Sequence, residues 1–125
     1  MGSLLREIVI DCTDPGAVSA FWRDVLGWEV RSEFQGEVEW FWMTAPRADE
    51  TKDLSLVFLP VPEAKTVKNR VHIDVSPTGC GQADELVRLL SLGAVQIDVG
   101  QGEQPWIVLA DPEGNEFCLL HNRVD

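Results

Sequence analysis

The chain has 125 residues, the length of one domain, and 45% of them are hydrophobic, an ordinary share for a folded globular protein. Its formal net charge of −11, from 21 acidic and 10 basic residues, argues against nucleic-acid binding and permits a cationic ligand, although it also suits a protein that is merely highly soluble. No apolar run approaches the ~20 residues that span a bilayer, and charge follows closely on the first residue, so we expect a cytoplasmic protein with no membrane partner.

The first half of the chain predicts one strand, one helix and three further strands. The first strand covers 4–11, and Asp14-Pro15 then opens the helix, because Asp suits the N-cap and Pro the first helical position. Gly27 ends the helix at a position where a positive φ is needed. The apolar stripe of this helix consists of Val18, Phe21, Trp22 and Val25. The following strands are 28–34, 37–43 and 54–60, with a tight turn at 35–36 and a polar loop over 45–53.

The second half predicts the same order of elements. Its helix covers 82–92, with Leu86, Leu89 and Leu90 on one face. The segment Asp111–Asn115 predicts a hairpin turn, because Pro favours the second position of a type I turn and Gly accepts the left-handed residue after it. The strands of this half are 70–75, 94–99, 106–110 and 116–121.

The two halves are spaced as an internal repeat. Asp11 and Asp74 each close an apolar strand and are 63 residues apart, and Gly27 and Gly93 each follow a helix and are 66 residues apart. Units of this size bury little core alone, so the pair should build a shared structure with a ligand cleft between its halves. We therefore expect a single domain over 1–125, with modules at about 3–62 and 69–122 and a linker at about 61–69.

His72 lies in a predicted central strand, and its side chain leaves the same face as that of Asp74. Side chains two residues apart diverge slightly, so direct contact between this pair is not expected. His72 is a candidate general base or ligand contact in the cleft. The alternative is a structural histidine satisfied by a neighbouring polar group, and both interpretations stay open.

Trp40 and Trp42 alternate along one strand and therefore share one of its faces. Together with Trp106 and Phe58 they predict an aromatic groove, since indoles stack on planar or cationic ligands. The alternative is an aromatic core between sheet and helix. Trp28, beside the first helix, is expected to be core.

Two smaller features complete the candidates. Lys65, Lys68 and Arg70 form a basic cluster, which would contact an anionic ligand or the acidic surface of a second subunit, or remain a solvated loop. The three cysteines, one of them Cys118, include no CxxC motif, and reduced thiols are favoured over a disulfide framework.

The doubled β-α-β-β-β pattern resembles the vicinal oxygen chelate superfamily, and within it the glyoxalase-like subgroup. Three motifs carry the resemblance: the helix motif Phe21–Trp28, the strand end His72-Ile73-Asp74 and the hairpin Ala110–Phe117. This superfamily includes glyoxalase I, bleomycin resistance proteins and extradiol dioxygenases. The resemblance implies an α+β fold of two tandem βαβββ modules that form a cup-shaped mixed sheet. It also implies a homodimer.

Metal-binding members of the superfamily place four side chains in the cup. The resemblance assigns these positions to Glu7, His72 and Cys118, and to a stretch of the fourth strand, 56–59, that contains no metal donor. A divalent ion of this type needs three or four hard or borderline donors, and a thiol suits zinc better than magnesium or manganese. We therefore expect no complete metal site and no cofactor.

These observations favour a bleomycin-resistance-like protein that binds a small aromatic or cationic molecule and has no nucleic-acid partner. The alternative is a lyase or isomerase of the glyoxalase type that uses a degenerate metal site or His72 with carboxylates. Whether the chain is an enzyme stays open, and no residue is assigned as catalytic. The candidate ligand-binding residues are Glu7, Trp40, Trp42, Phe58, His72, Asp74, Trp106 and Cys118.

Overall fold

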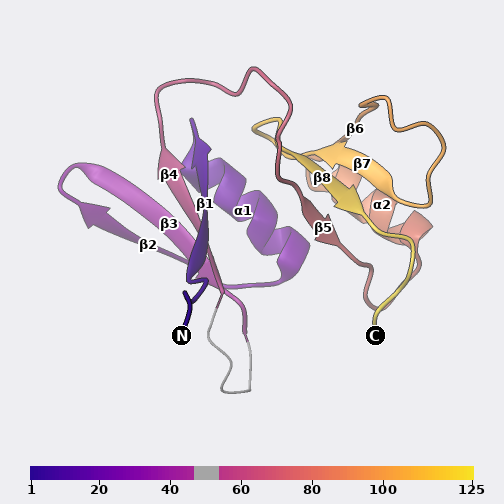
Figure 1. Ribbon diagram of the computed structural model, residues 1–125, viewed down its shortest axis with the longest axis horizontal. Helices are drawn as coiled ribbons and strands as arrows, with labels where there is room; N and C mark the ends of the chain where they lie inside the picture. Colours follow the sequence, from indigo (N-terminus) through magenta and orange to yellow (C-terminus); the bar gives the residue numbers. More distant parts are fainter. Residues whose placement is uncertain (47–53) are drawn as a thin grey trace. The chain divides into compact units, whose positions relative to one another are not determined.

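The computed structural model describes residues 1–46 and 54–125 (Figure 1). The loop predicted over 45–53 lies, apart from its first two residues, outside the described residues. The chain divides into two compact units, Met1–Ala64 and Lys65–Asp125, and the division falls within the segment 61–69.

The first unit contains one helix and a four-stranded sheet with the strand order β1-β4-β3-β2 (Figure 1). β1 runs parallel to β4, and the other neighbouring strands are antiparallel. The elements are β1 (Glu7–Cys12), α1 (Pro15–Leu26), β2 (Val30–Gln35), β3 (Val38–Thr44) and β4 (Ser55–Pro60).

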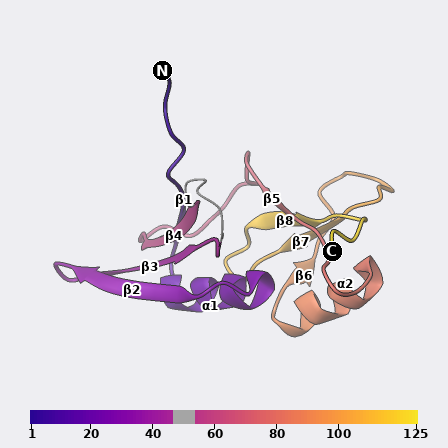
Figure 2. The same cartoon turned by 90° about the horizontal axis from the view of Figure 1, so that it is seen from below.

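Helix α1 begins and ends where the sequence predicts. The Asp14 carboxylate accepts a hydrogen bond from the Ala17 N–H at 3.1 Å, and the Gly27 N–H donates to the Arg23 carbonyl at 2.7 Å with Gly27 at φ 72°. All four residues of the predicted stripe are buried, and the helix packs on one face of the sheet, against β3 and β4 (Figure 2). The stripe therefore supplies the core of the first unit.

The second unit repeats this order with shorter strands. Its sheet has the order β5-β8-β7-β6, with β5 parallel to β8, and its helix α2 lies on one face (Figures 1 and 2). The elements are β5 (Ile73–Val75), α2 (Gln82–Ser91), β6 (Val95–Gln96), β7 (Ile107–Ala110) and β8 (Glu116–Leu119). Within the described residues, two helices and eight strands thus form two βαβββ modules, which confirms the predicted fold class.

Three predictions for the second unit need correction. The strand expected over 94–99 is reduced to the two residues of β6, Val95–Gln96. The strand expected from Arg70 begins only at Ile73, and just before the expected start the Asn69 N–H donates to the Glu116 carboxylate at 2.8 Å, so it is not available to a strand partner. In α2, Leu89 is fully buried but Leu90 is 41% exposed. The buried stripe instead pairs Leu89 with Glu85, four residues earlier, whose carboxylate accepts two hydrogen bonds of 2.8 Å from Arg88.

The predicted hairpin turn at Asp111 is present. The Asp111 carboxylate oxygen Oδ1 accepts hydrogen bonds from the N–H groups of Glu113 and Asn115, both at 2.9 Å. Gly114 adopts φ 87°, and its N–H donates to the Asp111 carbonyl at 2.8 Å. Asp111 is only 3% exposed, so these bonds satisfy a buried carboxylate and hold the turn between β7 and β8.

Neither helix among the described residues combines the length and the apolar composition that crossing a bilayer requires.

Candidate functional site

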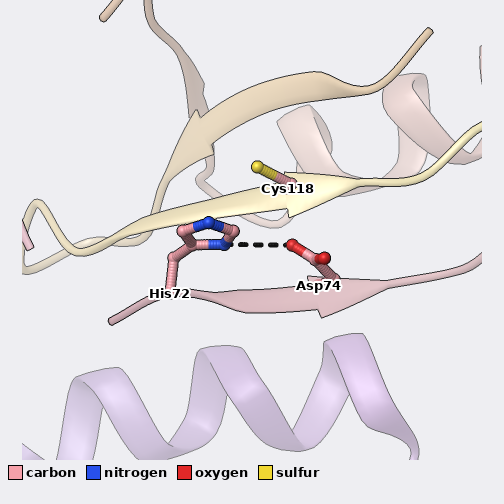
Figure 3. Close-up of side chains that lie close together, drawn as sticks. All are labelled: His72, Asp74 and Cys118. Carbon is pink, nitrogen blue, oxygen red and sulfur yellow. Dashed lines mark ion pairs between the residues drawn. The ribbon is translucent and has the colours of Figure 1, made fainter. Parts of the chain in front are cut away.

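Three side chains that can donate to a metal or exchange protons meet beside the parallel pair β5–β8 (Figure 3). Asp74 and Cys118 are register partners, so their side chains leave the same face of the sheet. His72 lies two residues before Asp74, and its Nδ1 is 3.0 Å from Asp74 Oδ1. The donor atoms of His72, Asp74 and Cys118 all lie within 4.8 Å of one another.

The direct contact between His72 and Asp74 corrects the sequence argument, which expected their side chains to diverge. His72 precedes the first residue of β5 and has no strand partner. Its ring is therefore not held by the pleat and is free to lie over the carboxylate (Figure 3). A shortened strand is what produces this pair.

The cluster combines exposed and buried groups. The side chains of His72 and Asp74 are each 45% exposed, whereas Cys118 is 7% exposed. Burial raises the pKa of the Cys118 thiol, and Asp74 raises it further through its negative charge and a hydrogen bond, while Lys68 acts in the opposite direction. Left alone, Cys118 is therefore a protonated thiol at neutral pH.

A buried carboxylate next to the cluster fixes the chain that leads into it. Glu116 is 8% exposed, and it accepts hydrogen bonds from Lys65 Nζ at 2.9 Å and from the Asn69 N–H at 2.8 Å. Burial alone would raise the pKa of Glu116, but these hydrogen bonds together hold it below its usual value. Lys65 therefore has a structural role as the cation that pairs with Glu116. Of the predicted basic cluster, Lys68 and Arg70 remain as candidates for contact with an anion.

Sequence reasoning missed Glu116 and its partners. The available signal was a Glu placed one residue before a buried strand position, where a carboxylate needs a cation or several donors. Its cation is 51 residues away in the chain, so only the folded structure identifies it.

Trp40 and Trp42 of β3 lie on the face of the first sheet opposite to α1. Phe41 marks the helix face, since its ring lies 3.6 Å from where a Cβ on Gly16 would stand. Trp40 and Trp42 alternate with Phe41 along β3 and so point the other way. Through the register with β4 and β1, Glu7 lies on this same face, which we call the open face of the first sheet.

Phe58 does not belong to the open face, contrary to the predicted groove. It is the register partner of Phe41, and its side chain is fully buried on the helix side. One residue of register reverses the direction of a strand side chain, and the sequence left that register undetermined. Trp106, just before β7 in the second unit, is 38% exposed.

A pocket of about 530 Å³ lies within the first unit at Trp42. Trp28, Arg31 and Thr44 also line it, and Arg31 is the register partner of Trp42 on β2. Trp28 is partly exposed here, so the prediction that it belongs to the core is wrong. It follows the Gly27 cap, where the chain turns back toward the sheet, and this turn brings the indole to the pocket wall.

The residues at the family's four metal positions do not form a complete donor set. On the fourth strand, Val57 and Leu59 share the open face with Glu7, but their side chains are apolar. His72 and Cys118 occupy the two positions in the second module, and there Asp74 joins them as an additional donor. A site of hard donors contributed by four strands therefore does not fit this chain.

Comparison with known proteins defines the class. A family model described as a glyoxalase-like domain matches residues 7–120. The chain belongs to this glyoxalase-like family and, through it, to the vicinal oxygen chelate superfamily. The search of curated proteins gave no match.

Solved structures agree on the fold. The fosfomycin resistance protein FosX from Mesorhizobium loti is 13% identical with a TM-score of 0.66, and the match covers 98% of this chain and 94% of that one. Glyoxalase I from Leishmania major is 13% identical with a TM-score of 0.64, covering 96% and 87%. The protein UcmS2 is 19% identical with a TM-score of 0.63, covering 95% and 98%. At these identities the likeness establishes the fold alone.

Proposed function

We propose that the chain binds a small aromatic molecule, neutral or cationic, in the pocket beside Trp28 and Trp42. The pocket itself is the observation that carries this proposal. Its volume of about 530 Å³ lies inside the range of ~300–1,000 Å³ that is typical of small-molecule sites. Its lining combines two indoles with the polar side chains of Glu29, Arg31 and Thr44, so a ligand would meet both aromatic and polar surface.

The lining also favours particular ligand chemistry. An aromatic ring stacked on an indole gains about 0.5–1.5 kcal/mol beyond its area of burial, and a cation over an indole gains about 0.5–2 kcal/mol. Arg31 and Glu29 place one charge of each sign at the pocket, so a polar substituent of the ligand finds a partner in either case. The net charge of −11 raises the local concentration of cations and so favours a cationic aromatic compound.

The test is calorimetric titration with hits from a thermal-shift screen of planar aromatic compounds, cationic and neutral. We expect Trp42→Leu to weaken binding by about 5-fold or more, since a stacked indole contributes about 1 kcal/mol or more. Phe34→Leu is the matched control, because Phe34 is 66% exposed on the same sheet but belongs to the helix face. Equal affinity of the wild type and Trp42→Leu for every hit would refute the pocket. Glu7→Gln tests whether this carboxylate, on the open face of the same sheet, also contacts the ligand.

A second candidate function is an enzyme of the lyase or isomerase class, and the His72–Asp74 contact of 3.0 Å favours it. A carboxylate that orients an imidazole is a common arrangement for a general base. Such a base would remove a proton from the substrate carbon next to a carbonyl group, and this proton would then exchange with solvent. Nuclear magnetic resonance in deuterated water, over a panel of small oxo-compounds, should show exchange that His72→Gln removes; its absence for every compound would reject this candidate.

We also propose a homodimer, which the superfamily resemblance supports, and a cytoplasmic location, which the lack of a membrane-length apolar run supports. Sedimentation velocity of the purified protein tests the dimer, and a monomer at micromolar concentration would reject it. Cell fractionation tests the location.

A further inference from the structure

The second module brings together three side chains of three chemical kinds: an imidazole nitrogen, a carboxylate oxygen and a thiol sulfur. We infer that His72, Asp74 and Cys118 bind a borderline divalent cation of the zinc class within this single module. The proposed site differs from the four-strand arrangement implied by the superfamily, because one of its donors, Asp74, is not one of the family positions. It also uses none of the residues that line the pocket of the first module.

The spacing of the donors suits one ion. Zinc lies ~2.0–2.3 Å from nitrogen, oxygen and sulfur ligands, so tetrahedral donors are separated by roughly 3.3–3.8 Å. His72 Nδ1 and Asp74 Oδ1 are already 3.0 Å apart, and no pair of donors in the cluster exceeds 4.8 Å. His72 and Asp74 are half exposed and have room for the small side-chain rotation that closes the set around an ion.

The charges of the donors also match. A thiolate and a carboxylate carry two negative charges and a neutral imidazole carries none, so a divalent cation leaves the cluster neutral. The ion displaces the proton of the Cys118 thiol, as metal binding by cysteine requires. Three protein ligands leave a fourth tetrahedral position for water or a bound molecule.

The donor set predicts selectivity. Thiolate and imidazole favour zinc and the soft cadmium ion, whereas magnesium and manganese prefer oxygen ligands. The Cys118 position should therefore turn a family site for hard ions into one for softer ions. A carboxylate at the same position would instead favour hard ions such as magnesium and manganese.

The first experiment titrates purified protein, stripped with a chelator and kept reduced, with cadmium and cobalt. We expect a single ion per chain and an ultraviolet charge-transfer band from the thiolate–metal bond. Competition should show that zinc binds more than about 100-fold more tightly than manganese, as the ligand preferences require. The absence of a band, or tighter binding of manganese than of zinc, would overturn the inference.

Variants then assign the ligands. Cys118→Ser should remove the charge-transfer band, and His72→Gln and Asp74→Asn should each weaken zinc binding by more than about 10-fold, at least the loss that an outer-shell partner causes. Cys80→Ser and His121→Gln are the matched controls, since the structure places neither residue in the cluster, and both should bind as the wild type does. Circular dichroism checks that each variant folds. If Cys118→Ser unfolds, the His72→Gln and Asp74→Asn variants still test the site, because both side chains are half exposed and their replacement should not disturb the core.

Unchanged binding in His72→Gln and Asp74→Asn would show that these side chains are not ligands, and loss of the band in Cys80→Ser would show that another thiol binds the ion. Either result would overturn the site. The result is separable from the proposed ligand pocket. Trp42→Leu should leave zinc binding unchanged, and Cys118→Ser should leave aromatic binding unchanged, so either proposal can fail without the other.

Discussion

The two modules share one topology but differ in the lengths of their strands, and the difference separates their chemistry. In the first module, strands of six and seven residues form a continuous ladder that fixes every side chain to a face and presents Trp40 and Trp42 on one of them. In the second, β5 has three residues and leaves His72 outside the ladder, so its ring folds over Asp74. The long strands of the first module thus place Trp40 and Trp42 on one face, and the short strand β5 of the second module places His72 in contact with Asp74.

Removal of the largest buried side chain should have the largest effect. Trp22 is 1% exposed and meets Phe21 edge to face, with ring centroids 5.4 Å apart. Trp22→Ala should destabilise the protein by about 3–5 kcal/mol in urea denaturation, because the cavity cannot close. Leu90→Ala, at an exposed position of α2, should change stability by less than about 0.5 kcal/mol. Similar losses in both variants would show that the first-module core does not dominate stability.

The second module should depend more on a buried charge. Glu116→Gln keeps the shape of the side chain but weakens the bonds from Lys65 and Asn69, and we expect a loss of about 1–3 kcal/mol. Glu103→Gln, on the exposed loop before β7, serves as the control and should have no measurable effect. If Glu116→Gln unfolds at the same urea concentration as the wild type, the carboxylate does not hold the second module together.

The pH dependence of stability should come from the same carboxylate. The pKa of Glu116 is lowered in the folded state, so its contribution is fully present above the unfolded value of about 4.3 and is lost as the pH falls through the folded value. Urea denaturation from pH 3 to 7 should therefore show a difference between wild type and Glu116→Gln that shrinks below about pH 4.3. A difference that stays constant over this range would exclude ionisation as its cause.

The N-terminal caps of the two helices also differ between the modules, and this difference should have the smallest effect on stability. The Asp14 side chain caps α1, whereas the N-cap residue of α2 is Gly81, which has no side chain that could accept a hydrogen bond. Asp14→Ala should cost about 1 kcal/mol, and Gly81→Ser should gain a few tenths of a kcal/mol, roughly the difference between Ser and Gly at an N-cap. Thermal unfolding measures both, and loss of stability in Gly81→Ser would show that the backbone there does not accept a cap.

Local chemistry determined most of the fold. The Asp14-Pro15 start, the Gly27 end and the stripe from Val18 to Val25 define α1, and the hairpin at Asp111 defines the junction of β7 and β8. These signals act over a few residues, so they can be read from the order of amino acids. Doubling of the pattern then predicted the βαβββ fold class, which the structure confirms, and the superfamily, which the family model confirms.

Only the tertiary structure decided which side chains share a site. Phe58 was removed from the aromatic face by the register of β4, and Trp28 was brought to the pocket by the turn after α1. His72 met Asp74 because β5 starts late, and Glu116 found Lys65 across 51 residues of chain. Strand register and long-range pairing arise from the packing of whole elements, and no pattern of neighbouring residues records them.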